Sequence, residues 1–204
     1  MSLSADSAGA AGSGPIDRAL AALDARRSVP ITQLEAPGPD DATLLRLLRS
    51  AVRVPDHGKR VPFRFVTLRG EARLAFSERL ARRSRERSPE AGEAAIEKDR
   101  LRFSYAPVIV TVVARLGPDE KIPEQERLLS AGCVCFALLQ AAQAVGFRGC
   151  WLTGWAAYDE VVAGWLGLAA DERVAGFIHL GTPRLDPPER ERPDPATLLS
   201  AWSP

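Results

Sequence analysis

Apolar and polar residues recur along this chain with the period of helices over three stretches. Residues 16–23 place apolar side chains every three to four positions, which is the spacing of one helical face. Residues 39–53 repeat that pattern, with Asp40 or Asp41 placed to cap the helix. The longest helix is expected over residues 124–146, which are acidic in the first turn and small or apolar on most faces thereafter. Such a helix belongs in the middle of a core or at a subunit interface.

Strands are predicted where apolar residues alternate or run together over a few positions. Residues 63–70 alternate, which suits a strand with one face better buried than the other. Residues 106–116 have a continuous run of β-branched side chains, which is typical of a central strand buried on both faces. A strand or strand-end loop is expected at 149–154, a short helix at 158–167 and a last strand at 172–183.

The regions between and outside these elements are polar. Residues 71–102 are dense in Arg and Glu, which predicts one or two solvated helices broken near Ser88-Pro89. Residues 1–14 are predicted to be a flexible leader, because nothing in them can offset the entropy of ordering by burial. Residues 186–204 are too rich in proline for a helix or an interior strand and are expected to form an extended arm. The order of elements predicts a single α+β domain over residues 15–185.

Composition and charge narrow the class of protein. A chain of 204 residues with 46% hydrophobic and 26% charged residues is typical of one globular core. The formal net charge of +1 provides no long-range field suited to nucleic acid or an anionic membrane, so a cationic site must be local. The longest strongly apolar run, near residues 108–114, is much shorter than the roughly 20 residues of a membrane span. Three cysteines form no even-numbered framework and the start lacks a signal-peptide pattern, so a cytoplasmic location is expected.

Residues that commonly bind metals or act as nucleophiles do not cluster in the sequence. His57 and His179 stand alone, and Cys133 and Cys135 are two positions apart on a predicted helix, which favours core packing over metal binding or redox pairing. The sequence has no Gly-x-Ser-x-Gly elbow, no Gly-x-x-x-x-Gly-Lys loop and no Gly-x-Gly-x-x-Gly turn. We therefore predict no metal site, and hydrolytic or nucleoside-triphosphate chemistry is unsupported.

Polar residues cluster instead in separate short segments, or stations, that could bind one ligand together. The Arg-Arg-Ser triplet at residues 26–28 follows the first predicted helix and could bind phosphate oxygens, although a basic helix C-terminus explains it equally well. Residues 53–62 carry four cations or potential cations and two prolines, which indicates an anion. Residues 149–154 offer a flat aromatic, a hydroxyl and close backbone that could line a ring system, or they are an ordinary strand end with Trp151 in the core.

Taken in order, these stations resemble the motifs of the nitroreductase family of flavin oxidoreductases. The triplet matches the opening pattern of that family, and residues 54–65 match its second motif, with Asp56-His57 most like its small, compact branch. Further matches are Ser130-Ala131-Gly132, Gly146-Phe147, the stretch 149–154 and Gly181-Thr182-Pro183. The resemblance covers about residues 16–185 and implies a central mixed β-sheet flanked by helices, with a long core helix.

The resemblance also implies a cofactor, a partner and a reaction. It implies a homodimer with FMN bound non-covalently at the subunit interface, and electron transfer from NAD(P)H to a small-molecule acceptor such as a nitroaromatic or a quinone. Because donor and acceptor would alternate on the same flavin, ping-pong kinetics are expected. No side chain is assigned as catalytic, since the cofactor performs the chemistry and the protein binds, orients and tunes it.

Carried over residue by residue, the resemblance assigns nine positions to the cofactor. The FMN phosphate and ribityl chain would be held by Arg26, Arg27 and Ser28. The flavin would be lined from the same subunit by Trp151, Leu152 and Thr153. The partner subunit would contribute Arg53 and His57, with Lys59 a weaker candidate, whereas Arg60 and Arg64 are expected to be solvated.

Four positions depart from the family pattern and leave alternatives open. Pro30 stands where many members carry a basic residue, Lys59 replaces a common asparagine, Val61 a common glutamine and Phe63 a common tryptophan. Two alternative functions therefore stay open. The protein could be a non-catalytic flavin-binding protein on the same scaffold, or a structural dimer that has lost its cofactor. No dinucleotide fingerprint chooses between NADH and NADPH.

Overall fold

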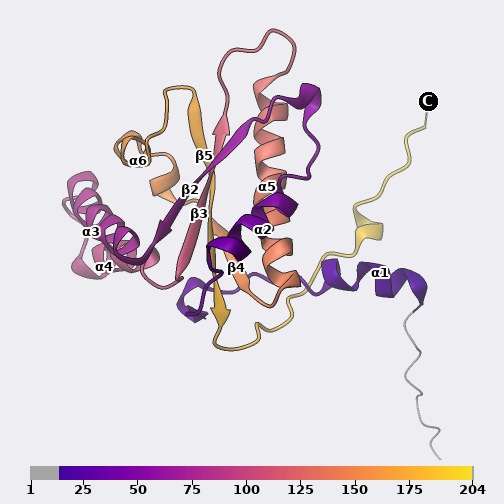
Figure 1. Cartoon of the computed structure of the whole chain (residues 1–204), viewed down its shortest axis with the longest axis horizontal. Helices are drawn as coiled ribbons and strands as arrows, with labels where there is room; N and C mark the ends of the chain where they lie inside the picture. Colours follow the sequence, from indigo (N-terminus) through magenta and orange to yellow (C-terminus); the bar gives the residue numbers. More distant parts are fainter. Residues whose placement is uncertain (1–13, 204) are drawn as a thin grey trace, which may run out of the picture.

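A computed structural model of the protein describes residues 14–203. A five-stranded sheet runs through the middle with helices packed on both faces (Figure 1). The α-helices are α1 (Pro15–Asp24), α2 (Asp41–Ala51), α3 (Gly70–Arg87), α4 (Glu93–Arg102), α5 (Glu124–Ala144) and α6 (Glu160–Trp165). The strands are β1 (Leu34–Glu35), β2 (Phe63–Arg69), β3 (Val108–Arg115), β4 (Arg148–Leu152) and β5 (Glu172–Pro183). Apart from Gly14, the predicted leader lies outside the described residues.

The sheet divides the core into two clusters, because neighbouring residues of a strand face opposite sides. Val110 and Val112 of β3 pack toward α2 and α5, together with Leu138 of α5. Ile109 belongs to the other cluster, with Phe103 and the aromatic residues under α3 and α4. Residues 108–114 are all buried, so the prediction of a strand covered on both faces is confirmed.

The strand β5 lies in the middle of the sheet, where it pairs with β1, β3 and β4. The strands follow the order β1-β5-β3-β2, and β4 also pairs with β5. All four strand pairs within residues 14–203 are antiparallel. The α+β class is confirmed, whereas the parallel pairs expected of a mixed sheet do not occur in this part of the chain. The helices α3 and α4 join β2 to β3, which run antiparallel, whereas α5 alone joins β3 to β4, which run in the same direction and both pair with β5.

Several helix boundaries follow directly from local chemistry. Asp40 caps α2, since its carboxylate accepts a hydrogen bond from the backbone N–H of Thr43 at 2.7 Å. The predicted break near Ser88-Pro89 is confirmed, because α3 ends at Arg87 and α4 begins at Glu93. The two-residue strand β1 was not predicted, since two residues are too short for a periodic signal.

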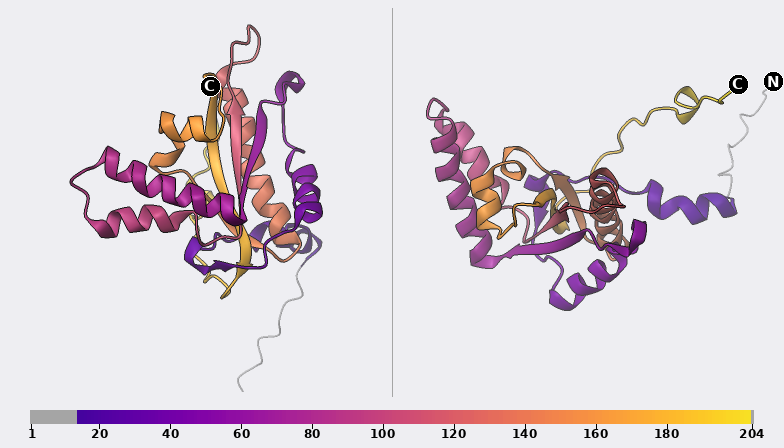
Figure 2. Two further views of the ribbon diagram at one scale, coloured as in Figure 1. Left: turned by 60° about the vertical axis from the view of Figure 1, so that its left-hand side comes forward. Right: turned by 90° about the horizontal axis from the view of Figure 1, so that it is seen from above.

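The long helix α5 forms the spine of one face. By length and composition alone it could cross a membrane, with 44% of its most apolar window buried. It packs instead on α2, β3, β4 and β5, which is the position of a core helix. In contrast, α1 and the C-terminal arm after β5 extend away from the same side of the body (Figure 2). Up to residue 203, the arm has no regular structure beyond one short 3-10 turn at Pro195–Thr197.

Candidate functional site

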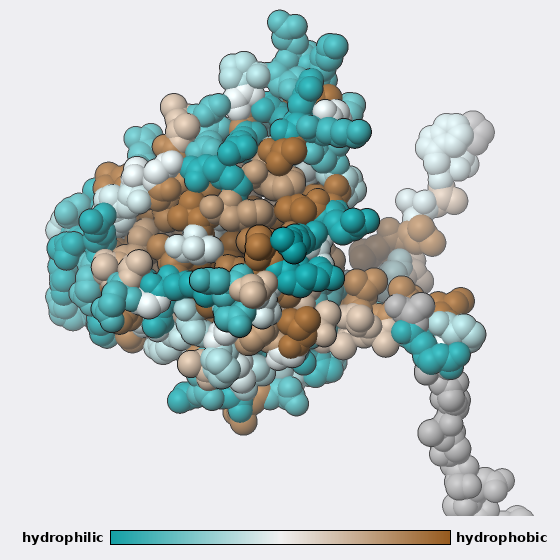
Figure 3. Space-filling view, in the orientation of Figure 1, coloured by the Kyte–Doolittle hydropathy of each residue, from teal (hydrophilic) through white to brown (hydrophobic). Residues whose placement is uncertain are grey.

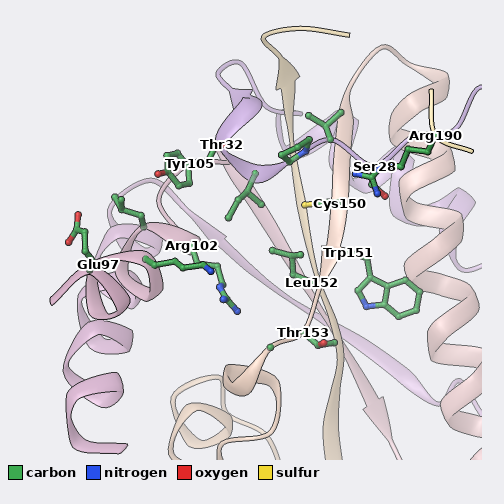
Figure 4. Close-up of a pocket in the computed structure, with 17 residues that line it drawn as sticks. Ser28, Thr32, Glu97, Arg102, Tyr105, Cys150, Trp151, Leu152, Thr153 and Arg190 are labelled. Atoms are coloured by element: carbon green, nitrogen blue, oxygen red, sulfur yellow. The ribbon is translucent and has the colours of Figure 1, made fainter. Parts of the chain in front are cut away.

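A cleft of about 1040 Å³ lies between α4 and β4. It is lined by residues 28–32, one side of α4, Tyr105, residues 150–154 and Arg190 of the arm (Figure 4). The cleft is therefore lined by Ser28 at the end of the Arg-Arg-Ser station, by most of the predicted ring-lining station and by one residue of the arm. Four of the nine predicted cofactor residues line it: Ser28, Trp151, Leu152 and Thr153.

Close backbone packing brings the first and third stations together. The backbone N–H of Val29 donates to the carbonyl oxygen of Gly149 at 3.1 Å, which places residues 26–30 beside β4. Gly149 must be glycine, since a Cβ there would collide with the backbone carbonyl of His179 on β5. Two segments about 120 residues apart in sequence thus become neighbours through one hydrogen bond and one close approach.

The two arginines of the first station differ in their surroundings. Arg26 donates from Nη1 to the hydroxyl of Ser28 at 3.3 Å, next to the cleft. Arg27 is held by the arm: its guanidinium pairs with Glu189 at 2.7 Å and donates to the carbonyl oxygen of Pro187 at 3.0 Å. Arg190, one residue further along the arm, lines the cleft at the same end as Ser28 (Figure 4). Sequence analysis missed Arg190 because nothing in the charged, proline-rich tail distinguishes it.

Trp151 lines both the cleft and a second hollow. Its indole Nε1 donates to the carbonyl oxygen of Ala175 at 3.1 Å, and the ring lies so close to Gly176 that a side chain there would collide with it. The residue is 40% exposed, so it is not an ordinary core tryptophan. The second hollow, of about 920 Å³, lies among α5, α6 and β5. Leu152 and Cys150 face the opposite side of the sheet from Trp151, because side chains alternate along β4.

Cys150, which lines the cleft, and the buried His179 beside it form a neutral floor. His179 pairs with Cys150 across β4 and β5 and is fully buried, 5.3 Å from the ring of Phe103. Burial, with a smaller contribution from the charge of Arg102, lowers the pKa of His179 to about 3, so the imidazole is uncharged at neutral pH. Burial also raises the pKa of the Cys150 thiol to about 12, which makes it a poor nucleophile.

The second predicted station, residues 53–62, lies elsewhere. Neither the cleft nor the second hollow is lined by Arg53, His57 or Lys59. The Nδ1 atom of His57 lies 2.7 Å from the carboxylate of Glu126, at the beginning of α5. In contrast, Gln143 near the end of α5 donates to the carbonyl oxygen of Ala22 at 3.2 Å, just before the first station. At a rise of 1.5 Å per residue, Glu126 and Gln143 are about 25 Å apart along α5.

The loop of the second station is nevertheless well formed. The carboxylate of Asp56 accepts hydrogen bonds from the backbone N–H groups of Arg60 and Val61 at 3.0 and 2.8 Å. Ser130 of α5 donates to the carbonyl oxygen of Pro55 at 2.8 Å. The backbone is held in the left-handed region at Gly58, Lys59 and Val61. The loop therefore presents exposed cations on a fixed support.

The two arginines expected to be solvated form ion pairs. Arg60 pairs with Asp119 at 2.7 Å. Arg64 makes a two-pronged contact with Glu172, at 2.7 and 2.6 Å, and holds the pKa of that carboxyl at about 2. Both arginines are thereby committed to structure, which agrees with excluding them from ligand binding. Within residues 14–203, His, Cys, Asp and Glu form no group of three or more that could hold a metal ion.

Comparison with known proteins gives consistent matches over most of the chain. A family model described as "Nitroreductase family" matches residues 23–182. The protein named "Putative NAD(P)H nitroreductase YdjA" of Escherichia coli (strain K12) is 36% identical over 167 residues, which cover 82% of this chain and 89% of that protein.

Two solved structures show the same fold. The nitroreductase-like family protein from Bacillus cereus has a TM-score of 0.75 at 20% identity, and the match covers 96% of this chain and 99% of that chain. A protein of Desulfovibrio desulfuricans, described as "a putative nitroreductase in complex with fmn", has a TM-score of 0.71 at 20% identity and covers 94% of this chain and 99% of its own. At these identities the structures establish the fold alone.

Proposed function

This chain belongs to the nitroreductase family, and on that basis we propose that it is an FMN-dependent oxidoreductase that passes electrons from NAD(P)H to a nitroaromatic, a quinone or a similar acceptor. The observation that carries the proposal is the cleft, which joins the end of the Arg-Arg-Ser station to residues 151–153 over a neutral floor. Its volume of about 1040 Å³ is that of a cofactor site. FMN in complex with a structural relative agrees with this assignment.

The residues present fit the two ends of FMN. At one end, Arg26 and Ser28 supply donors for a phosphate, and Arg190 adds a second guanidinium. At the other end, Leu152 and Thr153 offer an apolar side chain and a hydroxyl to a flat ring. Arg27 could reach the phosphate only after Glu189 releases it, so its role is the least direct of the first station.

The chain's own residues bind and orient the cofactor and keep one side of it dry. When bound, FMN supplies the redox chemistry by taking two electrons from NAD(P)H and giving them to the acceptor. The strand β4 closes the cleft on one side, so donor and acceptor would use the open side in turn, which predicts ping-pong kinetics. His179 and Cys150 contribute no proton transfer at neutral pH, because burial keeps both groups neutral.

We further propose a homodimer in which Arg53 and His57 of one subunit reach the FMN held by the other. The separation of the stations along α5 supports this arrangement, because one chain does not bring both to the same ligand. A stripe on α5 also favours it, since Leu129 is 61% exposed, Phe136 is 46% exposed and Cys133 lies between them. Apolar side chains gather across the middle of the face shown in Figure 3.

An absorbance spectrum and an anaerobic reduction test the enzymatic function. Purified protein should show flavin bands between about 350 and 500 nm, and these should bleach when NADH or NADPH is added without oxygen. Yellow protein whose flavin stays oxidised would favour the non-catalytic flavin-binding alternative. A colourless protein that added FMN neither colours nor stabilises would support the structural dimer.

Mixing two variants tests the shared site. Arg26→Ala should weaken FMN binding by roughly 1.5 to 3 kcal/mol if it makes a charge-assisted phosphate contact, and Arg53→Ala should act similarly. In a mixed dimer, one site would carry both substitutions and the other neither. Unfolding and random reassociation of an equal mixture should therefore restore about a quarter of the sites to full FMN affinity. If both residues served the same chain, no mixed dimer would contain an intact site.

A further inference from the structure

Arg102 is the last residue of α4, and its guanidinium reaches toward the end of β4 (Figure 4). It lies so close to Gly154 that a side chain at that position would collide with Nη1. Gly154 also has a φ of 64°, which favours glycine on conformational grounds. The backbone after Thr153 thus allows the guanidinium to lie against the cleft at the end assigned to the flavin ring.

The positive charge of Arg102 is poorly neutralised within the described chain. Its one ion pair there is with Asp99 at 3.8 Å, which is too long for a hydrogen bond. The other carboxylate oxygen of Asp99 accepts from Ser84 at 2.7 Å and from Trp155 at 3.0 Å, so this carboxylate is oriented by other donors. The Arg102 side chain is 23% exposed, and its charge contributes to lowering the pKa of buried His179. Arg102 therefore lies close enough to act on His179 beneath the cleft.

Arg100, on the same helix, differs from Arg102 because its charge is neutralised by ion pairs. Arg100 pairs with Glu97 and with Glu78, the latter at 3.2 Å, and does not line the cleft. A basic helix C-terminus would explain either arginine by its effect on the helix dipole. It does not explain why Arg102 turns toward Gly154 and leaves its donors without a hydrogen-bond partner among residues 14–203.

We propose that Arg102 lies against the bound flavin ring and stabilises its reduced, anionic form. This inference rests on the proposed function. Hydride transfer from NAD(P)H moves two electrons and one proton to the neutral oxidised ring, which leaves the ring with one negative charge and releases NAD(P)⁺. A cation in a partly desolvated cleft stabilises that anion much more than the neutral ring. Arg102 is thus a tuning residue that raises the reduction potential of the flavin.

The test is the midpoint potential of bound FMN in Arg102→Gln, measured by equilibration with a reference dye. We expect the potential to fall by about 30 to 60 mV, which is a ten- to hundredfold loss in the relative affinity for reduced over oxidised FMN. The affinity for oxidised FMN, measured by titration, should change by less than that factor. Arg100→Gln is the matched control and should leave the potential unchanged. Arg102→Met gives a second uncharged variant of similar length, in case the glutamine variant does not fold.

Each other outcome overturns the inference. A potential equal to that of Arg100→Gln would show that Arg102 acts on the helix alone. Equal losses in affinity for oxidised and reduced FMN would make it a simple binding residue. An unchanged potential with a raised KM for NADPH alone would assign it to a phosphate of the electron donor. A wild-type protein that binds no FMN would overturn the proposed function itself, which distinguishes that failure from the others.

Discussion

Basic residues from other segments lie near both ends of α5, and the two groups are organised in opposite ways. At its beginning, the loop of residues 53–62 is fixed by Asp56 and by Ser130, yet its basic side chains lie exposed. Near its end, residues 26–28 lie beside β4 over a buried, neutral floor. One end is therefore a rigid support that lines neither the cleft nor the second hollow, and the other is a pocket that one chain lines with only part of the expected cations.

This difference shows how a symmetric dimer can build a site from distant parts of one sequence. A two-fold axis perpendicular to α5 would make the two copies of α5 run in opposite directions, so the beginning of one would lie near the end of the other. The exposed stripe of Leu129, Cys133 and Phe136 lies between the two ends, where such an axis would pass. The proposed contact surface and the proposed shared site thus depend on each other.

Placing a charge in the middle of this stripe should have the largest effect. Phe136→Asp would introduce two unpaired carboxylates at the proposed dimer interface, each costing on the order of 3 to 5 kcal/mol. We expect dissociation to become at least about a thousandfold easier, with loss of FMN, although Phe136 belongs to neither station. Sedimentation and the ratio of flavin to protein absorbance measure both effects. Leu74→Asp, at an exposed apolar position of α3 on the other side of the sheet, is the matched control. A variant that stays dimeric and yellow would contradict the shared site.

Acid should lower the stability of the folded protein through His179, which lies under the cleft. Its pKa is about 3 in the folded protein and 6.5 in the unfolded chain, so below pH 6.5 the unfolded state binds a proton that the folded state excludes. Stability is complete above pH 6.5 and falls as the pH drops, by about 2 kcal/mol between pH 7 and pH 5. Glu172, with a pKa of about 2, adds its own loss only at pH values below its ordinary 4.5.

Denaturant unfolding at several pH values measures this slope. His179→Leu should remove most of it between pH 7 and pH 5, because leucine buries no titratable group. His57→Gln changes the exposed histidine and should leave the slope in place. If His179→Leu retained the full loss, another group would have to take up the proton.

Most elements of the fold could be predicted because their signals are local. The period of apolar residues defines α5, continuous β-branched residues define β3, and Asp40 marks the start of α2 by capping chemistry. The strand β1 could not be predicted, since it has two residues and exists only through pairing with residues 182 and 183.

The candidate site could be predicted only in part. The triplet at 26–28 and residues 151–153 have distinctive sequence, and three-dimensional contact joins them through Val29 and Gly149. Arg102 has no such signal, because it lies in a region dense in Arg and Glu where only the fold separates it from Arg100. The contact between Arg27 and Glu189 is equally hidden, since it joins residues 162 positions apart.

Removing the hydroxyl that anchors the loop should have the smallest effect and tests the other end of α5. Ser130→Ala would lose the hydrogen bond to the carbonyl of Pro55, which should cost about 1 kcal/mol of unfolding free energy. If the loop supplies Arg53 and His57 to the partner's cofactor, its loosening should weaken FMN binding by up to about fivefold. Ser50→Ala, which removes only a surface hydrogen bond with Arg46 at 2.7 Å, is the matched control and should leave FMN affinity unchanged. Equal FMN affinity in both variants, with Ser130→Ala still destabilised, would mean that the loop supports the fold and does not position a ligand contact.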